Sequence, residues 1–272
     1  MRSTGYGNEV SPMMTDSLGE RMKGYEEVSR TILPTRTYTV LRVDGRAFHT
    51  LLRGADKPFD TRLMGYLDAV GVALAREVSG AMIGYVQSDE VSIVATDLTS
   101  PHTQPWFGGV VQKMVSIAAA RASVHFNKVS HYPVDALFDA RVFTVPSAIE
   151  AQNYLIWRQR DAIRNSISMA AQAVFSHKQL HGVNTMEMIE KLSHEGILWE
   201  EYPLGCRYGR TIVRRVGRGP VTWTHKKTGE TQTTIADRSW WEPQPAPLFL
   251  LGADLLDEKI PLSPENAISC QP

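Results

Sequence analysis

The sequence contains few cysteines and no long apolar run. Its two cysteines, Cys206 and Cys270, are far apart and lack a Cys-x-x-Cys spacing, so they predict neither a disulfide framework nor a zinc site. Such sparse use of cysteine fits a reducing cytoplasm. No apolar run is long enough to span a membrane, and the first residues lack the apolar core of a signal peptide. We therefore expect a cytoplasmic protein without a membrane segment.

An excess of charge of one sign is also absent. Lys plus Arg and Asp plus Glu each number 29 among the 272 residues, which gives a formal net charge of zero. The chain as a whole neither attracts nor repels nucleic acid, so any RNA binding has to come from a local basic patch. Hydrophobic residues make up 43% of the chain, a fraction that supports a globular core and excludes disorder throughout.

One acid-glycine pair directly follows an apolar segment with the features of a strand. Residues 38–43 have the length and β-branched content of a buried strand, and Asp44-Gly45-Arg46 comes next. An acid at the end of a strand is a candidate metal ligand. Glycine leaves room for a ligand beside the main chain, and the following amides can point at a phosphate. Asp-Gly is also a common turn dipeptide, and alone it indicates only a turn.

The order of helix and strand patterns predicts an α+β fold. It is β-α-β-β-α-β, with strands at residues 36–43, 81–87, 91–96 and 138–145 and helices at residues 61–78 and 106–128. This order is typical of the ferredoxin-like split βαβ unit, one antiparallel sheet backed by two helices, which we call the palm. In such a sheet the end of the first strand and the turn between the second and third strands share an edge. Asp44 and Asp89 are therefore expected to lie together.

Composition and pattern divide the chain into four parts. Residues 1–15 predict a flexible tail, and residues 16–146 predict the palm domain. The palm domain begins with a helix that is capped by Asp16 or Ser17, and the apolar face of this helix contains Leu18, Met22, Tyr25 and Val28. Residues 147–239 predict an extension packed on the palm, with helices at 147–175 and 185–194. A hairpin of residues 205–216 and 221–234 follows, with a further turn at residues 227–229. The proline-containing residues 240–272 predict an irregular tail.

The two acids on one edge indicate metal-dependent chemistry. With an accessible Gly45 carbonyl they form an oxygen set for two Mg²⁺ ions, which sit about 3.5–4 Å apart in two-metal sites. Glu90 lies beside them, and Arg42 shares a strand face with Asp44. Arg46, Lys57 and Lys113 add positive charge for a triphosphate, and Arg42 is a further candidate nucleotide contact. Singly, Lys57 and Lys113 also fit exposed surface lysines, and residues 88–90 fit a solvated turn; jointly the residues indicate a nucleotidyltransferase or a cyclase.

Five motifs in order resemble those of the tRNA-His guanylyltransferase family. The resemblance runs from about residue 19 to residue 212, and the motifs are Arg42-Val43-Asp44-Gly45-Arg46-Ala47-Phe48, Lys57-Pro58-Phe59-Asp60, Gln87-Ser88-Asp89-Glu90, Phe138-Asp139-Ala140-Arg141 and residues 154–161, which include Trp157-Arg158-Gln159. The resemblance implies a ferredoxin-like palm of the polymerase and cyclase type. It also implies an enzyme that adds nucleotides to the 5′ end of tRNA, in the direction opposite to ordinary polymerases. It also implies two Mg²⁺ ions, GTP and ATP as substrates, and a homo-oligomer, a tetramer in the family.

The resemblance also assigns roles to residues. It implies that Asp44, the Gly45 carbonyl and Asp89 hold the metals and that Glu90 supports them. It further implies that the triphosphate is contacted by residues of the loop after the first strand and of the acidic turn: Gly45, Arg46, Ala47, Phe48, His49 and Ser88.

The chain departs from the eukaryotic enzymes of this family at one motif. Those enzymes carry His-Ile-Asn-Asn where this chain has Ile163-Arg164-Asn165-Ser166. The basic cluster that family members carry after the acidic hairpin is also reduced, because Gly108, Gly109 and Val110 precede Lys113. These departures favour the guanylyltransferase-like branch of archaea, bacteria and viruses. That branch implies template-dependent addition to tRNAs truncated at the 5′ end.

Several residues of the extension are candidates for RNA contacts. Arginines recur along the helical region and the hairpin, as expected of a surface that binds RNA phosphates, and the predicted contacts are Arg158, Asp161, Asn165 and Arg207. Trp157 is expected in the core, because apolar residues such as Leu155 and Ile163 surround it in the sequence. His177 and His181 have helical spacing but no third ligand nearby, so we expect a helix end rather than a zinc site.

Two other functions remain compatible with the sequence. A palm-fold nucleotide cyclase would use the same acids without tRNA, although it would not need the helical extension or the Trp-Arg-Gln segment. A non-catalytic RNA-binding protein could keep the fold, although the complete set of acids argues against loss of the site.

Overall fold

The computed structural model describes residues 17–251 and 254–262 of the chain. The chain divides into two units, residues 1–31 and 32–272, and each is considered by itself. The first contains α1 (Ser17–Glu27), which has no buried residue, and the predicted apolar face is exposed at Leu18, Met22, Tyr25 and Val28. Of the two predicted caps, Ser17 is the first residue of α1, and Asp16 lies outside the described residues.

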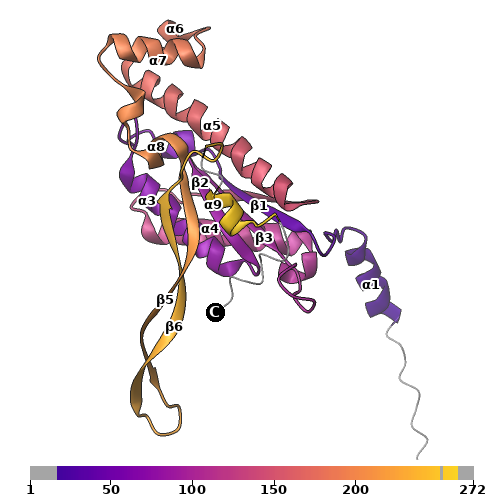
Figure 1. The fold of residues 1–272 in the computed structure, drawn as a ribbon. Coiled ribbons are helices and arrows are strands. Elements are labelled where there is room, and N and C mark those ends of the chain that lie inside the picture. Colours follow the sequence, from indigo (N-terminus) through magenta and orange to yellow (C-terminus); the bar gives the residue numbers. More distant parts are fainter. Residues whose placement is uncertain (1–16, 252–253, 263–272) are drawn as a thin grey trace, which may run out of the picture. The chain divides into compact units, whose positions relative to one another are not determined.

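In its described residues, the second unit is built on a six-stranded antiparallel sheet with the order β4-β1-β3-β2-β5-β6 (Figure 1). The strands are β1 (Tyr38–Gly45), β2 (Ala81–Gln87), β3 (Glu90–Thr96), β4 (Phe138–Val145), β5 (Arg210–Thr224) and β6 (Thr231–Pro245). The first four strands and two helices follow one another as β-α-β-β-α-β, which confirms the predicted ferredoxin-like palm.

Alternating residues of β1 divide the core between the two faces of the sheet. Leu41 and Val43 belong to one buried cluster with α3 (Thr61–Glu77) and α4 (Val111–Val129), whereas Val40 belongs to a second cluster on the other face. Asp60 caps α3, and its side chain accepts hydrogen bonds from two backbone N–H groups. The short helix α2 (Phe48–Leu51) follows β1.

The predicted helix of residues 106–128 is wrong at its start. Residues Trp106–Gly109 form a separate 3-10 turn, η1, because Phe107 and Gly108 have positive φ angles of 50° and 61°, which an α-helix does not accommodate. The α-helix therefore begins five residues later than predicted, at Val111.

The second face of the sheet is covered by one long helix, α5 (Ala148–Val174), which the Ser147 side chain caps. Its residues Ala151, Tyr154 and Leu155 share a buried cluster with Val40 and other sheet residues. After α5 come four short elements, α6 (His177–Leu180), α7 (Thr185–His194), η2 (Trp199–Glu201) and α8 (Leu204–Tyr208). The bounds of α7 agree with the predicted helix of residues 185–194, and the Asn184 side chain caps it.

Polar groups also dock α5 on the sheet. Arg158 makes a bidentate ion pair with Glu90, with Nε 2.8 Å from Oε1 and Nη2 2.6 Å from Oε2. One helical turn earlier, the hydroxyls of Tyr154 and Ser92 lie 2.8 Å apart. Arg158 and Glu90 are both buried, at 7% and 5% exposure, so the two charges depend on each other.

The C-terminal hairpin is longer than predicted. β2 pairs with β5 only from Gly84 to Val86, and beyond that point the described residues of β5 and β6 pair only with each other, forming the long ribbon in Figure 1. Residues 217–220, expected as a turn, continue β5, whereas the further turn predicted at residues 227–229 is confirmed and lies within residues 225–230. A two-stranded ribbon tolerates Pro220 and the neighbouring glycines because each strand has a free edge.

The prediction of an irregular segment from residue 240 onward is also wrong in part. Residues 240–245 complete β6, and α9 (Asp254–Lys259) follows. Leu256 and Ile260 are buried in the same cluster as α5, so this segment contributes to the core. None of the described helices has the length and apolar character needed to cross a membrane.

We expect Arg158→Ala to lower the free energy of unfolding by about 3–5 kcal/mol, because it leaves a buried carboxylate without its partner. Burial raises the pKa of Glu90 above its ordinary value, and Arg158 opposes that rise. In the variant the penalty should therefore shrink as the pH falls through this raised pKa and Glu90 takes up a proton. Urea denaturation at several pH values measures both effects.

Arg164→Ala is the matched control. Arg164 pairs with Asp161 at 2.6 Å, but its side chain is 61% exposed, so its loss should cost less than about 1 kcal/mol. Combining Arg158→Met with Glu90→Gln should restore most of the lost stability. Equal stability of Arg158→Ala and wild type would contradict the role given to this pair.

Candidate active site

Three acids converge at one edge of the palm, as the topology predicts for two of them. Asp44 lies near the end of β1, Asp89 lies in the turn between β2 and β3, and Glu90 begins β3. The register pairs Asp44 directly with Glu90, and the Gly45 N–H donates to the Asp89 carbonyl at 3.1 Å. The first strand's end and the acidic turn are therefore held together by backbone pairing.

The loops that carry these acids are tightly constrained. A Cβ atom on Gly45 would lie 2.3 Å from the Phe48 ring, so only glycine fits where that ring packs. Ala47 and Ser88, neither of which is glycine, have positive φ angles of 54° and 48°. Such conformations cost on the order of 1–3 kcal/mol each and cluster at functional sites, and here one flanks each side of the acidic edge.

The positive charge at this edge is unevenly distributed. Asp44 Oδ2 lies 3.2 Å from Arg42 Nε and 3.1 Å from Arg141 Nη2, and Glu90 is paired with Arg158. In the part of the chain that the structure describes, no basic side chain forms an ion pair with Asp89. Burial raises the pKa of Asp89, and the negative charge of Asp44 adds to the rise, against a hydrogen bond from Ser88.

This arrangement fits a divalent cation that shares its ligands with a substrate. No three His, Cys, Asp or Glu side chains among the described residues form a ready-made metal cluster. Mg²⁺, however, is commonly held by one or two carboxylates together with water and substrate phosphates. Asp44 and Asp89 supply two such carboxylates, and a cation near them would oppose the burial and the repulsion from Asp44 that raise the pKa of Asp89.

Glu90 has a different environment from the two aspartates. Its Oε1 accepts hydrogen bonds from Arg158 and, at 3.3 Å, from Ser92, while Oε2 faces Arg158 and Arg42. Both oxygens are thus occupied by the protein. The structure therefore favours Glu90 as a residue that positions α5 and Arg42 behind the acids, and it does not support a direct catalytic contact.

The predicted triphosphate contacts are only partly brought to this edge. Arg46, Ala47 and His49 are exposed, and so is Lys57 in the loop before α3. The amides of Gly45 and Arg46 are used within the protein, the latter donating to the Leu137 carbonyl at 2.8 Å, so they are not free for phosphate. Arg42 faces Asp44 and Glu90 with a side chain only 14% exposed.

The structure contradicts the placement of Lys113. The next residue, Met114, lines a hollow with Thr39 and Thr96, and this is the end of the sheet where Tyr38 pairs with Thr96. Phe126, at the other end of α4, contacts Phe48 beside the acidic edge. Because α4 spans the length of the sheet, its first turn lies at the end opposite Asp44.

The predicted RNA contacts are used mostly inside the protein. Arg158 is buried against Glu90, so the structure does not favour its contact with RNA. Asp161 accepts from Arg158 at 2.9 Å and from Arg164 at 2.6 Å, and these arginines lower its pKa despite burial. Arg207 donates to the Tyr202 carbonyl at 2.8 Å and stacks on Trp199 and Tyr208. Asn165 is exposed.

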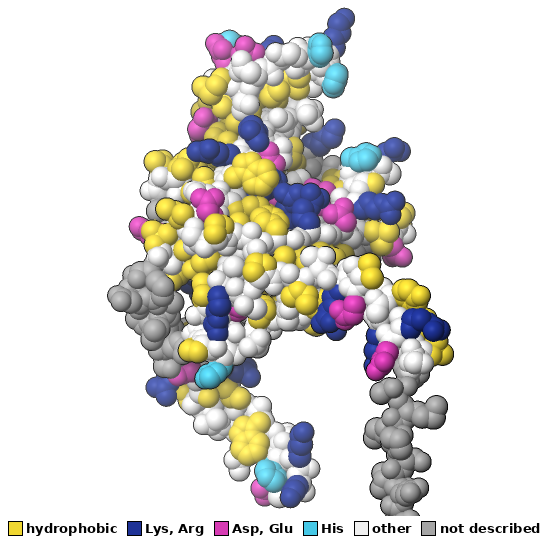
Figure 2. All heavy atoms as spheres, turned by 90° about the vertical axis from the view of Figure 1, so that its right-hand side faces the viewer, with side chains coloured by type: hydrophobic (Ala, Val, Ile, Leu, Met, Phe, Trp, Pro, Cys, Tyr) yellow, Lys and Arg dark blue, Asp and Glu magenta, His cyan; other side chains and the backbone are white. Residues whose placement is uncertain are grey.

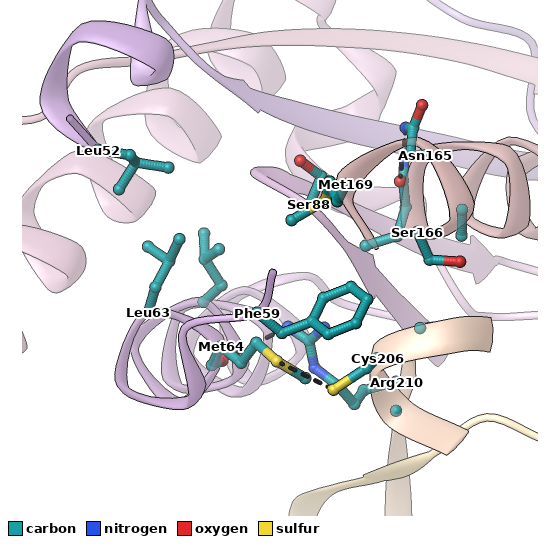
Figure 3. A pocket seen from close by; sticks show the side chains of 15 residues that line it. Leu52, Phe59, Leu63, Met64, Ser88, Asn165, Ser166, Met169, Cys206 and Arg210 are labelled. Carbon is teal, nitrogen blue, oxygen red and sulfur yellow. Dashed lines mark hydrogen bonds between the residues drawn. The ribbon is translucent and has the colours of Figure 1, made fainter. Parts of the chain in front are cut away.

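A pocket opens beside the acidic turn (Figure 3). In Figure 3, Leu52 and Leu63 lie across the pocket from Ser88, Asn165 and Met169. The lining is mainly apolar, and its amide groups come from Gln87 and Asn165, which lie 3.5 Å apart. Ser88 thus belongs both to this pocket and to the turn that carries Asp89.

Two residues near the site were missed or misplaced from the sequence. Arg141 pairs in register with Arg42 across β1 and β4, a relation that the predicted strand order contained. Trp157 is not in the core as predicted but 51% exposed. A helical wheel separates it from the buried stripe of α5, Ala151, Leu155, Arg158 and Ala162.

Comparison with known proteins agrees with this architecture. A family model described as tRNAHis guanylyltransferase matches residues 19–146. The tRNA(His) guanylyltransferase of Schizosaccharomyces pombe is 30% identical over 162 residues, which cover 57% of this chain and 59% of that protein.

Two solved structures of bacterial tRNA(His) guanylyltransferase-like proteins match nearly the whole chain. The structure in complex with ATP is 36% identical with a TM-score of 0.79, and the one in complex with GTP is 34% identical with a TM-score of 0.74. Each match covers 91% of this chain and 100% of the solved chain. The chain is therefore a nucleotidyltransferase that belongs to the tRNAHis guanylyltransferase family.

Proposed function

We propose that this enzyme adds guanosine or templated nucleotides to the 5′ end of tRNA, in the 3′–5′ direction, with two Mg²⁺ ions at Asp44 and Asp89. The observation that carries the proposal is the pair of carboxylates at one sheet edge, of which Asp89 lacks a basic partner among the described residues. Family membership supports the reaction type. A nucleotide cyclase would use the same edge, but it would not need RNA.

Each residue at this edge has a task in the proposed reaction. When bound, the metal ions stabilise the attacking and leaving oxygens of a phosphoryl transfer. Asp44 and Asp89 hold them as carboxylates, together with the Gly45 carbonyl, while Arg42 and Arg141 fix the orientation of Asp44. The exposed cations Arg46 and Lys57 balance the charge of the triphosphate.

The pocket beside Ser88 suits the base of the incoming nucleotide. Its apolar walls, including Leu52, Leu63 and Met169, offer contact area to a flat ring. Its amide groups, on Gln87 and Asn165, are few, which fits a site that accepts more than one purine. The bacterial relatives were solved in complex with ATP and with GTP, and we propose that both nucleotides bind here.

The altered motif of α5 supports template-dependent repair over obligatory addition to an intact histidine tRNA. Ile163 stands where the eukaryotic enzymes carry histidine, and it packs against a buried cluster that contains Leu192 and Trp199. This position therefore contributes to packing in this chain. We also propose the family's tetrameric assembly, which light scattering would test.

We expect Asp44→Asn and Asp89→Asn each to reduce nucleotide addition by at least about a thousandfold, because each removes a metal-holding charge worth several kcal/mol. The assay follows labelled GTP onto a 5′-truncated tRNA. Asp237→Asn is the control: Asp237 lies on the exposed hairpin, paired with Arg218, and its change should leave addition intact. Unimpaired addition by Asp44→Asn or by Asp89→Asn would refute the assignment of these residues to the metal site.

The raised pKa of Asp89 predicts a particular pH dependence. Protonation of Asp89 competes with metal binding, so at subsaturating Mg²⁺ activity should fall at a pH above the ordinary aspartate range of about 4. Saturating Mg²⁺ should move this acid limb to lower pH. An acid limb that does not respond to the Mg²⁺ concentration would show that another group controls it.

Asn165→Ala should distinguish nucleotide binding from RNA binding at this position. If Asn165 contacts the base in the pocket, its loss should raise KM for GTP by about fivefold, as expected for one hydrogen bond of about 1 kcal/mol, and leave KM for the RNA unchanged. Ser168→Ala, on the adjacent part of α5, serves as the control. A rise in KM for RNA alone would place Asn165 at the RNA.

A further inference from the structure

Trp157 is exposed but held in a defined place. Half of its surface is open, at 51%, yet its ring centroid lies 5.9 Å from that of Tyr154, which in turn contacts Phe143 of β4 at 5.7 Å. The Arg158 guanidinium carbon lies 4.4 Å from the Trp157 ring centroid. Since Arg158 is itself fixed by Glu90, the indole is supported by groups that cannot easily move.

Two arginines share the exposed side of α5 with this ring. Arg160 and Arg164 follow Trp157 by three and seven residues, a spacing that places all three along one helical stripe about 10 Å long. Arg164 is paired with Asp161 but keeps 61% of its side chain exposed. Arg160 is exposed and forms no ion pair with any described residue.

This stripe lies on another side of α5 from the pocket beside Ser88, and its Trp157 end is next to Arg158, which contacts the acidic edge. Trp157 adjoins Arg158, which pairs with Glu90, the register partner of Asp44. The pocket beside Ser88 is lined by a different set of α5 residues, Ala162, Asn165, Ser166 and Met169. In the turned view of Figure 2, basic and acidic side chains gather beside large hydrophobic groups on one face. The helix thus offers two separate places for a nucleoside.

We propose that Trp157 stacks on the base of the 5′-terminal nucleotide of the RNA substrate, while Arg160 and Arg164 contact the phosphates that follow. An aromatic ring with adjacent cations is the combination that binds single-stranded nucleic acid without sequence preference. Base-independent binding suits a repair enzyme, because truncated ends differ in their last base. The inference rests on the proposed function, since it names the residue that receives the RNA end.

An RNA that lacks only the terminal base tests this stacking directly. Two 5′-truncated tRNAs are compared, one intact and one with an abasic 5′-terminal nucleotide, and their Kd values are measured for wild type and Trp157→Ala. We expect Trp157→Ala to weaken binding of the intact RNA by about fivefold to a hundredfold, the range of one base–aromatic stack. The abasic RNA should bind wild type equally weakly, and Trp157→Ala should weaken it no further.

Three further variants separate stacking from folding. Trp157→Phe should keep most of the binding, whereas Trp157→Leu, which fills space without an aromatic face, should lose it. Trp223→Ala removes another exposed tryptophan, which lies on the hairpin and is 43% exposed. The ratio of its Kd values for abasic and intact RNA should equal that of wild type. Thermal melting verifies that each variant is folded. If Trp157→Ala does not fold, the comparison of Trp157→Phe with Trp157→Leu still tests whether an aromatic ring is needed for binding.

The outcomes also separate this inference from the proposed function. Equal weakening of intact and abasic RNA by Trp157→Ala, or a change in KM for GTP without a change in RNA affinity, would overturn the stacking role. Failure of wild type to extend either RNA would overturn the proposed function, while the binding comparison would still report whether Trp157 stacks.

Discussion

The pairing of β1 with β3 is the constraint on which the site depends. Its register puts Asp44 opposite Glu90, and the hydrogen bond from Gly45 to the Asp89 carbonyl closes the edge. Three carboxylates are thereby forced into a narrow space, which is unfavourable unless their charge is compensated. The fold compensates two of them with arginines, Asp44 through Arg42 and Arg141 and Glu90 through Arg158.

The third carboxylate gives the edge its chemical character. Asp89 has no basic partner among the described residues, and burial and the charge of Asp44 both raise its pKa. In the proposed function, a divalent cation that binds together with a triphosphate supplies the positive charge that Asp89 lacks. The buried Arg158–Glu90 pair, in turn, fixes α5 beside the edge. That helix then lines the pocket beside Ser88 on one side and exposes Trp157 on another.

The sequence predicted those features that follow from topology. The β-α-β-β-α-β order necessarily brings the end of the first strand to the acidic turn, so Asp44 and Asp89 were placed together correctly. Predictions that depended on which way a helix runs along the sheet, or on which of its faces is buried, were less successful. Lys113 was assigned to the triphosphate, but α4 begins at the far end of the sheet. Trp157 was assigned to the core because its sequence neighbours are apolar, whereas the turn of the helix exposes it.

Arginine was the residue type whose role was hardest to predict. Arginine is the residue type expected on a surface that binds RNA, yet Arg158 and Arg207 are both held inside the protein. Arg158 is paired with Glu90, which is far away in the sequence. Arg207 bonds to Tyr202 and stacks on Trp199 and Tyr208. No sequence pattern within α5 or α8 indicates these partners.

The predicted bounds of the hairpin were wrong because glycine and proline indicate turns in an ordinary sheet but are tolerated in an isolated two-stranded ribbon.

The central claim is that Asp44 and Asp89 together hold the metal that activates the triphosphate. Anomalous diffraction from crystals grown with Mn²⁺ and a non-hydrolysable GTP analogue would test it most directly. We expect manganese peaks bound to carboxylate oxygens of both aspartates and to the triphosphate, with Glu90 still paired to Arg158. Manganese bound to the triphosphate at another place, with the Asp89 carboxylate free of metal, would contradict it.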